Sequence, residues 1–375
     1  MQMSVDPIAL ARDLINCASV TPARGEVFDV LEAALMPLGF TVHRFVLGEP
    51  PDGPTENMVA IRGEGGTHFG FAGHLDVVPP GEGWATDPFE TVIENGILAG
   101  RGAVDMKSAI AAFVAAASRV DAGGTTSLLI TGDEEGYATY GTPRIIDWLN
   151  EHGIRPDMIL IGEPTSVDRL GDTIKIGRRG SVNMWIDVPG TQGHVAYPHR
   201  ADNPVPKLAK VVDALSALQL DDGTDAFPPS NLEFTAISTP TNASNVIPSA
   251  AQAQLNIRFN NLHKGADLVQ LVEDTAAKAA PGTTVRARIS GEAFLTPAGG
   301  LYDLVVSAIR DETGIEPELS TSGGTSDGRF LIQLCPVVDF GLPNATMHKV
   351  GEGAAVEDIR ALSRIYGRVI EKAFA

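Results

Sequence analysis

Two motifs near the start of the chain combine strand ends with side chains of the metal-ligand type. His74 and Asp76 stand in GHLD, at the end of an apolar segment. Residues two apart at a strand end face the same side, so His74 can bind a metal ion while Asp76 approaches its other ring nitrogen. In ITGDEEG an apolar segment runs into Asp133, Glu134 and Glu135, and open α/β sheets place their sites at such strand ends. Together these residues make a metal site a hypothesis, although a His-x-Asp at a strand end often occurs by chance and adjacent carboxylates at a turn are usually surface charge.

Three more motifs extend the set. Asp105 in GRGAVDMK precedes a predicted helix, Glu163 closes the apolar segment of LIGEP, and His348 follows the apolar segment VVDFGL. Taken singly, each has an ordinary explanation, because an aspartate before a helix is more often a cap than a ligand. Four predicted strands that each lead to a potential ligand are much harder to attribute to chance. Two histidines and three carboxylates suit a pair of zinc ions better than magnesium or calcium, which prefer all-oxygen sites.

The elements that must position these residues alternate between helices and strands. Apolar residues recur at helical spacing from Val5 to Leu38, and the following segments alternate in the same way up to Glu163. This alternation predicts an α/β domain in which helices cover a largely buried sheet. Strands are expected at 41–47, 67–76, 126–133 and 158–164, and helices at 108–120 and 142–153.

The rhythm changes between Ser181 and Gly291, where the segments read strand, helix, strand, strand, helix, strand. This βαββαβ order is the split motif of ferredoxin-like domains. The α/β pattern resumes from Tyr302 and ends in a helix near Lys372. We therefore expect a metal-binding catalytic domain of residues 1–180 and 292–375, with a lid or dimerisation domain of residues 181–291 inserted at an exposed loop.

Composition limits the possible partners and location. The chain has 375 residues and a net charge of −19, which disfavours binding to nucleic acid or to an anionic membrane. Only two cysteines, Cys17 and Cys335, are present, so no disulfide framework is expected and a reducing cytoplasm fits. The longest run of small uncharged residues, Ala109–Ala117, is too short to span a bilayer, and no signal peptide is expected.

Several motifs together resemble a known family. The motifs are GHLDVVPPG, GRGAVDMK, ITGDEEG, IGEPTSVDRLGDTIKIGRRGS, GTQGHVAYPHRADNP, STSGGTSDGRF and NATMHKV. They are similar to those of the bacterial succinyl-diaminopimelate desuccinylases, a branch of the zinc amidohydrolase and exopeptidase superfamily. The resemblance implies hydrolysis of N-succinyl-LL-2,6-diaminopimelate to succinate and LL-2,6-diaminopimelate, in lysine and diaminopimelate biosynthesis, with two divalent ions. Zinc is expected, with cobalt as the alternative.

The resemblance also implies a role for each residue. Glu134 would be the general base, and Asp76 would steady the ring of His74. A cis peptide bond is expected between Asp105 and Met106. Two ions carry about +4 and the three ligating carboxylates about −3, so a bridging hydroxide would leave the centre near neutral. One ion would be held by His74 and Glu163, the other by Glu135 and His348, and Asp105 would bridge the two.

Substrate binding requires cationic partners, because the implied substrate carries three carboxylates and the protein is acidic. Arg178 in GRRGS and Arg258 in NIRFN are the candidates, since a guanidinium holds a carboxylate with two hydrogen bonds. Exposed arginines are, however, usually solvated surface groups. Further hydrogen-bond donors are expected from Asn245, Gly324, Thr325 and Asn344.

His194 in GHVAYPH lies within the expected insertion. A histidine on a loop more often has a structural role. By resemblance, this one crosses from the partner subunit of a homodimer and donates a hydrogen bond to the oxyanion of the tetrahedral intermediate.

Three other functions compete with this hypothesis. The nearest is another amide hydrolase of the superfamily, such as an acetylornithine deacetylase or a dipeptidase. A non-catalytic binding protein is disfavoured because it needs no base such as Glu134. A structural zinc protein is disfavoured because structural sites are usually closed and rich in cysteine, and neither cysteine is near a ligand motif.

Overall fold

The chain forms two compact units in a computed structural model that describes residues 4–120 and 123–375. Unit 1 consists of Met1–Gly177, Thr296–Ser320 and Ser326–Ala375, and unit 2 of Arg178–Leu295 and Thr321–Thr325. Each unit has its own hydrophobic core. Unit 2 is inserted into the chain of unit 1, and the segment 181–291 lies within it.

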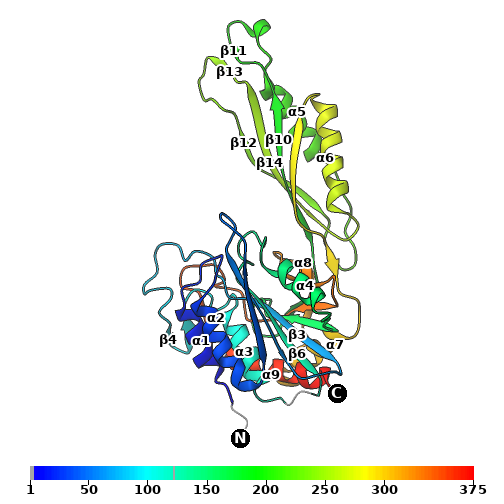
Figure 1. The fold of residues 1–375 in the computed structure, drawn as a ribbon. Helices are drawn as coiled ribbons and strands as arrows, with labels where there is room; N and C mark the ends of the chain where they lie inside the picture. The colour runs from blue at the N-terminus through cyan, green and yellow to red at the C-terminus, as the bar shows by residue number, and fades with distance from the viewer. Residues whose placement is uncertain (1–3, 121–122) are drawn as a thin grey trace. The chain divides into compact units, whose positions relative to one another are not determined.

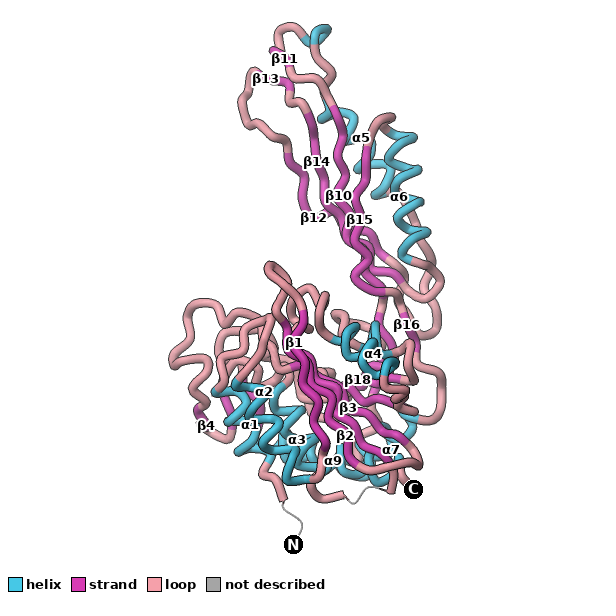
Figure 2. The backbone as a smooth tube through the Cα atoms, in the orientation of Figure 1, coloured by secondary structure: helices cyan, strands magenta, loops and turns pink. Residues whose placement is uncertain are grey.

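A mixed sheet of eight strands forms the centre of unit 1, in the order β1-β2-β6-β3-β7-β18-β8-β17 (Figure 2). The four neighbours β6, β3, β7 and β18 run parallel, so their carboxyl ends meet at one edge of the sheet. β2 is antiparallel to β6 and β1 to β2. The strands are β1 (Thr41–Leu47), β2 (Thr55–Arg62), β3 (His68–His74), β6 (Thr125–Thr131), β7 (Met158–Ile161), β8 (Thr173–Lys175), β17 (Glu318–Ser320) and β18 (Val337–Asp339).

Helices cover both faces of this sheet (Figure 1). On one face α3, which is buried along its whole length, packs against α1 and α9, because its many alanines permit close approach. Phe113 of α3 stacks on Phe71 of β3 with ring centroids 4.2 Å apart. The helices of this face are α1 (Pro7–Asn16), α2 (Glu26–Leu35), α3 (Lys107–Ala117), α7 (Leu301–Thr313) and α9 (Val356–Ala373), while α4 (Thr142–Glu151) packs on β2 and β6 and contacts α8 (Gly328–Leu331).

The structure differs from the sequence expectation in unit 1 in the first helices and in the turn before Asp105, among other places. The helical spacing from Val5 to Leu38 belongs to two helices, α1 and α2, followed by the short helix η1 (Met36–Leu38). Proline cannot continue a helix interior, and Pro22 lies in the break between them. The segment before Asp105, expected to be a glycine-rich turn, contains the strand β5 (Ile97–Ala99). β5 pairs with β4 (Val92–Glu94) and β19 (Gly353–Ala355) in a small three-stranded sheet.

Unit 2 contains the expected βαββαβ order, with an antiparallel sheet arranged β12-β14-β10-β15. Burial alternates along β14 because α5 and α6 cover only one face of the sheet (Figure 2). Two short strands, β11 and β13, pair beyond the end of β10. The elements are β9 (Gly177–Arg178), β10 (Gly180–Pro189), β11 (Gly193–His194), η2 (Pro198–Arg200), α5 (Pro204–Ser216), β12 (Asn231–Ser238), β13 (Val246–Ile247), β14 (Ala250–Phe259), α6 (Gly265–Ala279), β15 (Thr284–Gly291) and β16 (Phe294–Leu295).

No described helix is both long enough and apolar enough to cross a membrane.

Candidate metal centre

The carboxyl ends of three neighbouring parallel strands bring the predicted ligands of unit 1 together. His74 is the last residue of β3, and its register partner on β6 is Thr131, shortly before Glu134 and Glu135. Glu163 follows β7, the other neighbour of β3. The side chains converge because parallel strands end at the same edge.

Asp105 lies at the middle of this cluster. Its Oδ1 atom is 3.1 Å from Nε2 of His74, and its Oδ2 atom is 3.3 Å from Nε2 of His348. The two carboxylate oxygens therefore face two different imidazoles. This is the arrangement required of a carboxylate that bridges two ions.

Each imidazole has a second carboxylate neighbour. Nε2 of His74 is 3.8 Å from Oε1 of Glu163, and Nε2 of His348 is 2.8 Å from Oε1 of Glu135. The pairs on either side of Asp105 are the two pairs that the resemblance implies. These distances support the predicted ligand assignment.

The donor atoms lie close enough for metal coordination. Those of His74, Asp105 and Glu135 all lie within 4.8 Å of one another, and so do those of His74, Glu134 and Glu163. Imidazole and carboxylate donors fit zinc and similar divalent ions. Glu134 is therefore also within ligand range of His74 and Glu163.

The electrostatics of the cluster favour positive charge. Hydrogen bonds to Asp105 and Glu135 raise the pKa of His348 to about 10. Burial alone would lower the pKa of His74, but the hydrogen bond to Asp105 and the charges of Asp76 and Glu163 raise it well above its usual value. The carboxylates thus stabilise added protons on both rings, as they would stabilise a divalent cation. The residues fit a metal centre in both donor type and charge.

Burial, followed by the charges of Asp327 and Glu135, raises the pKa of Glu134 to about 8, although the charge of His74 opposes this shift. Divalent cations beside the group would favour its charged form and lower this pKa. Glu134 would then be ionised near neutral pH and able to accept a proton, as a general base must.

Asp76 contacts His74 differently from the expectation. Nδ1 of His74 lies 2.9 Å from the backbone carbonyl of Asp76 and 3.6 Å from its carboxylate. The carboxylate instead accepts hydrogen bonds from the backbone N–H groups of Glu134 and Glu135, at 3.2 and 3.0 Å. Asp76 therefore orients the ring through its main chain and holds the Glu134–Glu135 turn through its side chain.

The expected cis peptide bond between Asp105 and Met106 is present.

Asp327 and Lys107 are buried polar residues near the cluster that were missed from the sequence. Asp327, 3% exposed, accepts a hydrogen bond from Thr142 Oγ1 at 2.6 Å, and burial raises its pKa. Lys107 donates to the carbonyl of Cys17 at 3.0 Å, and burial lowers its pKa to about 7. Both stand in motifs that support the family resemblance, GGTSDGRF and GRGAVDMK. The motifs do not reveal that these charges are buried.

The predicted substrate residues are divided between the units, with Asn344 in unit 1 and the others in unit 2. Arg178 is buried and donates from Nη1 to the carbonyl of Gly324 at 2.9 Å. Gly324 is thus an acceptor for Arg178, although its N–H was the group expected to serve the substrate. Thr325 follows it and is partly buried. Burial and then the charge of Arg179 lower the pKa of Arg258, so the two positive charges lie close enough to repel one another.

Asn245 and His194 lie side by side in unit 2. Val246 pairs with His194 across β11 and β13, and the carbonyl of Asn245 accepts a hydrogen bond from Val195 N at 3.2 Å. Both residues are exposed. A ligand or protein surface that binds the side chain of His194 can therefore also contact the side chain of Asn245.

Replacing Glu163 by Ala is expected to weaken binding of one ion about 100-fold or more, because a direct ligand is lost. Metal content after equilibrium dialysis against buffered zinc measures this. The metal-free protein should be no less stable than wild type, since one of several clustered like charges is removed. Wild-type zinc affinity in this variant would exclude Glu163 as a ligand.

Comparison with known proteins relates this geometry to a family. Residues 70–372 match the peptidase family M20/M25/M40. The chain is 60% identical over 372 residues to the succinyl-diaminopimelate desuccinylase of Rhizorhabdus wittichii, covering 99% of both chains. It is also 60% identical over 377 residues to that of Sphingopyxis alaskensis, covering 100% of both.

Solved structures show the same fold at low sequence identity. The M20 family metallo-carboxypeptidase Sso-CP2 of Sulfolobus solfataricus has a TM-score of 0.78 at 16% identity, covering 98% of this chain and 99% of that one. Aminopeptidase PepT of Bacillus cereus has a TM-score of 0.77 at 18% identity, covering 98% and 99%. The chain belongs to the peptidase family M20/M25/M40 and, within it, to the succinyl-diaminopimelate desuccinylases.

Proposed function

We propose that this protein hydrolyses N-succinyl-LL-2,6-diaminopimelate to succinate and LL-2,6-diaminopimelate, with two divalent ions, zinc or cobalt, in its centre. The observation that carries the proposal is the 60% identity to succinyl-diaminopimelate desuccinylases over 99% of both chains. The clustered ligands at the strand ends support it. This activity places the protein in lysine and diaminopimelate biosynthesis. Both cysteines are free and buried, which fits a cytoplasmic enzyme.

Five residues would hold the ions in this proposal. When bound, the ions polarise the amide carbonyl and lower the pKa of a water molecule. The side chains contribute fixed positions, because all five come from strand ends or from loops next to them. They are His74 and Glu163 for one ion, Glu135 and His348 for the other, and Asp105 for both.

Glu134 would carry the proton through the reaction. It takes a proton from the water whose oxygen attacks the amide carbon, and later delivers a proton to the amine nitrogen as the carbon–nitrogen bond breaks. The products are then the succinate carboxylate and the free amine. Asp76 keeps Glu134 in place by accepting the backbone N–H bonds of the turn.

Replacing Arg178 by Ala is expected to raise KM for the succinylated substrate about 10- to 100-fold, because a charge-assisted hydrogen bond to a carboxylate is lost. The change in kcat should be smaller, since the bond is present in both ground and transition states. Steady-state kinetics measure both values. Arg286→Ala is the matched control, because it removes an exposed cation of the same unit. Unchanged kinetics in a folded Arg178→Ala protein would remove Arg178 from the substrate site.

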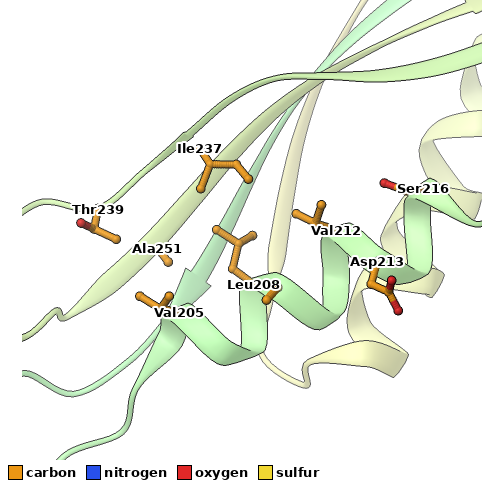
Figure 3. Close-up of a pocket in the computed structure, with 9 residues that line it drawn as sticks. Val205, Leu208, Val212, Asp213, Ser216, Ile237, Thr239 and Ala251 are labelled. Carbon is orange, nitrogen blue, oxygen red and sulfur yellow. The ribbon is translucent and has the colours of Figure 1, made fainter.

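A homodimer through unit 2 is part of the proposal. β12 is an edge strand of its sheet, and Ile237 on it is 61% exposed. Beside it lies an apolar groove of about 430 Å³, in which Leu208 of α5 and Ile237 point toward one another (Figure 3). An exposed apolar edge of this kind is a natural pairing surface. A second copy can bury it by presenting the same surface.

Parallel assays of succinylated and acetylated substrates test the proposed specificity. We expect N-succinyl-LL-2,6-diaminopimelate to be hydrolysed, while N-acetylornithine and dipeptides are poor substrates. The reason is that an acetyl group lacks the carboxylate that the proposed substrate arginines would bind. Preferred turnover of the acetylated compound would assign the protein to a different branch of the family.

A further inference from the structure

Arg101 and Glu352 form a buried ion pair beside the candidate metal centre. The pair joins two segments that are far apart in the sequence. Nη1 of Arg101 is 2.5 Å from Oε2 of Glu352, and the side chains are 2% and 0% exposed. Arg101 precedes Asp105 by a short turn, and Glu352 follows His348 by another. β5 and β19, which adjoin the two turns, pair in an antiparallel manner. The pair therefore joins the two turns that deliver Asp105 and His348.

The carboxylate of Glu352 makes direct contact with the backbone of the Asp105 turn. Its Oε1 atom accepts hydrogen bonds from the N–H groups of Val104 at 2.8 Å and Asp105 at 3.1 Å. The backbone N–H of Gly100 donates to the Glu352 carbonyl at 3.0 Å. These bonds fix the main chain from which the Asp105 side chain projects.

The guanidinium of Arg101 makes the matching contact with the His348 turn. Its Nη2 atom donates to the carbonyls of Pro80 at 3.2 Å and His348 at 3.4 Å, and its face lies 5.4 Å from the Trp84 ring. His348 has a φ of 60°, in the left-handed region that a residue with a side chain rarely adopts. Contacts from the surroundings must maintain such a conformation.

We propose that Arg101 and Glu352 are positioning residues that set the separation between Asp105 and His348, and thereby the affinity for the ion that these two residues share. This inference rests on the proposed metal centre. Neither charged group is within the set of ligands, and both act through hydrogen bonds to the backbone. Residues that orient metal ligands in this way commonly contribute 10- to 100-fold to metal affinity.

Glu352→Gln is the test variant. The amide oxygen can still accept from Val104 and Asp105, but its NH₂ group faces the donors of Arg101, so the ion pair is lost. Titration of the metal-free variant with zinc in a calorimeter should show one binding event weakened about 10- to 100-fold. The weakened event should be the one lost in His348→Ala. The other event should be weakened less, since it involves Asp105 but not His348, whose turn the pair also holds.

Two further readouts separate positioning from a general loss of stability. Excess zinc should restore much of the activity of Glu352→Gln, because the defect is one of affinity. The matched control is Glu312→Gln, which removes a carboxylate paired with Arg364 and Arg368 between α7 and α9. That variant should lose thermal stability while binding both ions as wild type does. Should Glu352→Gln not fold, Arg101→Lys keeps a cation opposite Glu352 and is expected to weaken the same binding event.

The outcomes are distinct. Wild-type affinity for both ions in a folded Glu352→Gln or Arg101→Lys protein would overturn the inference. Equal effects in Glu352→Gln and Glu312→Gln would overturn it as well, because they would indicate stability alone. If wild-type protein itself binds no zinc, the proposed function fails instead.

Discussion

Replacing Glu134 by Gln is expected to reduce desuccinylation by a factor of about 10² to 10⁴, while both ions remain bound. Glutamine has nearly the same shape but cannot accept the proton of the attacking water. Burial raises the pKa of Glu134 to about 8 in the protein without ions, and the surrounding cations would bring it into the range of a base. Turnover and zinc content, measured on the same preparation, check the two parts of this result.

Glu163→Ala is the control for the Glu134 result, because both residues lie within ligand range of His74. The two variants should have opposite signatures, with metal kept in Glu134→Gln and weakened in Glu163→Ala. Wild-type turnover in Glu134→Gln would exclude this residue as the base. Loss of an ion in that variant would make Glu134 a ligand.

The second large effect concerns His194. His194→Ala alone is expected to be nearly inactive, since an oxyanion donor is worth about 3–4 kcal/mol of transition-state stabilisation. Nδ1 of His194 accepts a hydrogen bond from Ala196 N at 3.1 Å, so the proton of the neutral ring is on Nε2. The exposed ring thus presents a donor, as an oxyanion requires.

The position of His194 in unit 2 motivates its action across a dimer. β10, which begins close to where the chain enters unit 2, has 10 residues and a length of about 33 Å at 3.3 Å per residue. His194 follows its far end, beside Asn245. We therefore expect both residues to serve the active site of the partner subunit.

Subunit mixing tests this directly. Glu134→Ala and His194→Ala should each be inactive as homodimers, yet a heterodimer of the two contains one site with both groups and one site with neither. Co-expression with two different affinity tags isolates that heterodimer, and up to about half of the wild-type activity should return, because one of two sites is complete. A verified heterodimer as inactive as its parents would mean that His194 acts within its own chain or not at all.

The sequence predicts the ligand cluster well because two simple rules apply to it. Strands of apolar residues are recognisable from their pattern, and the carboxyl ends of parallel strands meet at one edge, so His74, Glu135 and Glu163 could be placed together before their distances were known. The βαββαβ order of unit 2 was likewise readable from its segments. β2 was missed, although it is an interior strand of the sheet, between β1 and β6.

Other features depend on contacts that no local pattern encodes. The carboxylate of Asp76 lies 3.6 Å from the second ring nitrogen of His74, but its hydrogen bonds from two N–H groups of the turn after β6 were not foreseen. Arg101 and Glu352 are 251 positions apart in the sequence. Each appears in the sequence as an ordinary charge next to a glycine. Only the fold makes them a buried pair.

Release of succinate from N-succinyl-LL-2,6-diaminopimelate, followed as zinc is added back to the metal-free protein, tests the central claim most directly. The account predicts no turnover without metal and a rise to a plateau near two ions per chain. It also predicts a value of kcat/KM at least about 100-fold higher than for N-acetylornithine under the same conditions. Full activity in the metal-free protein, or equal efficiency on the acetylated compound, would contradict the account.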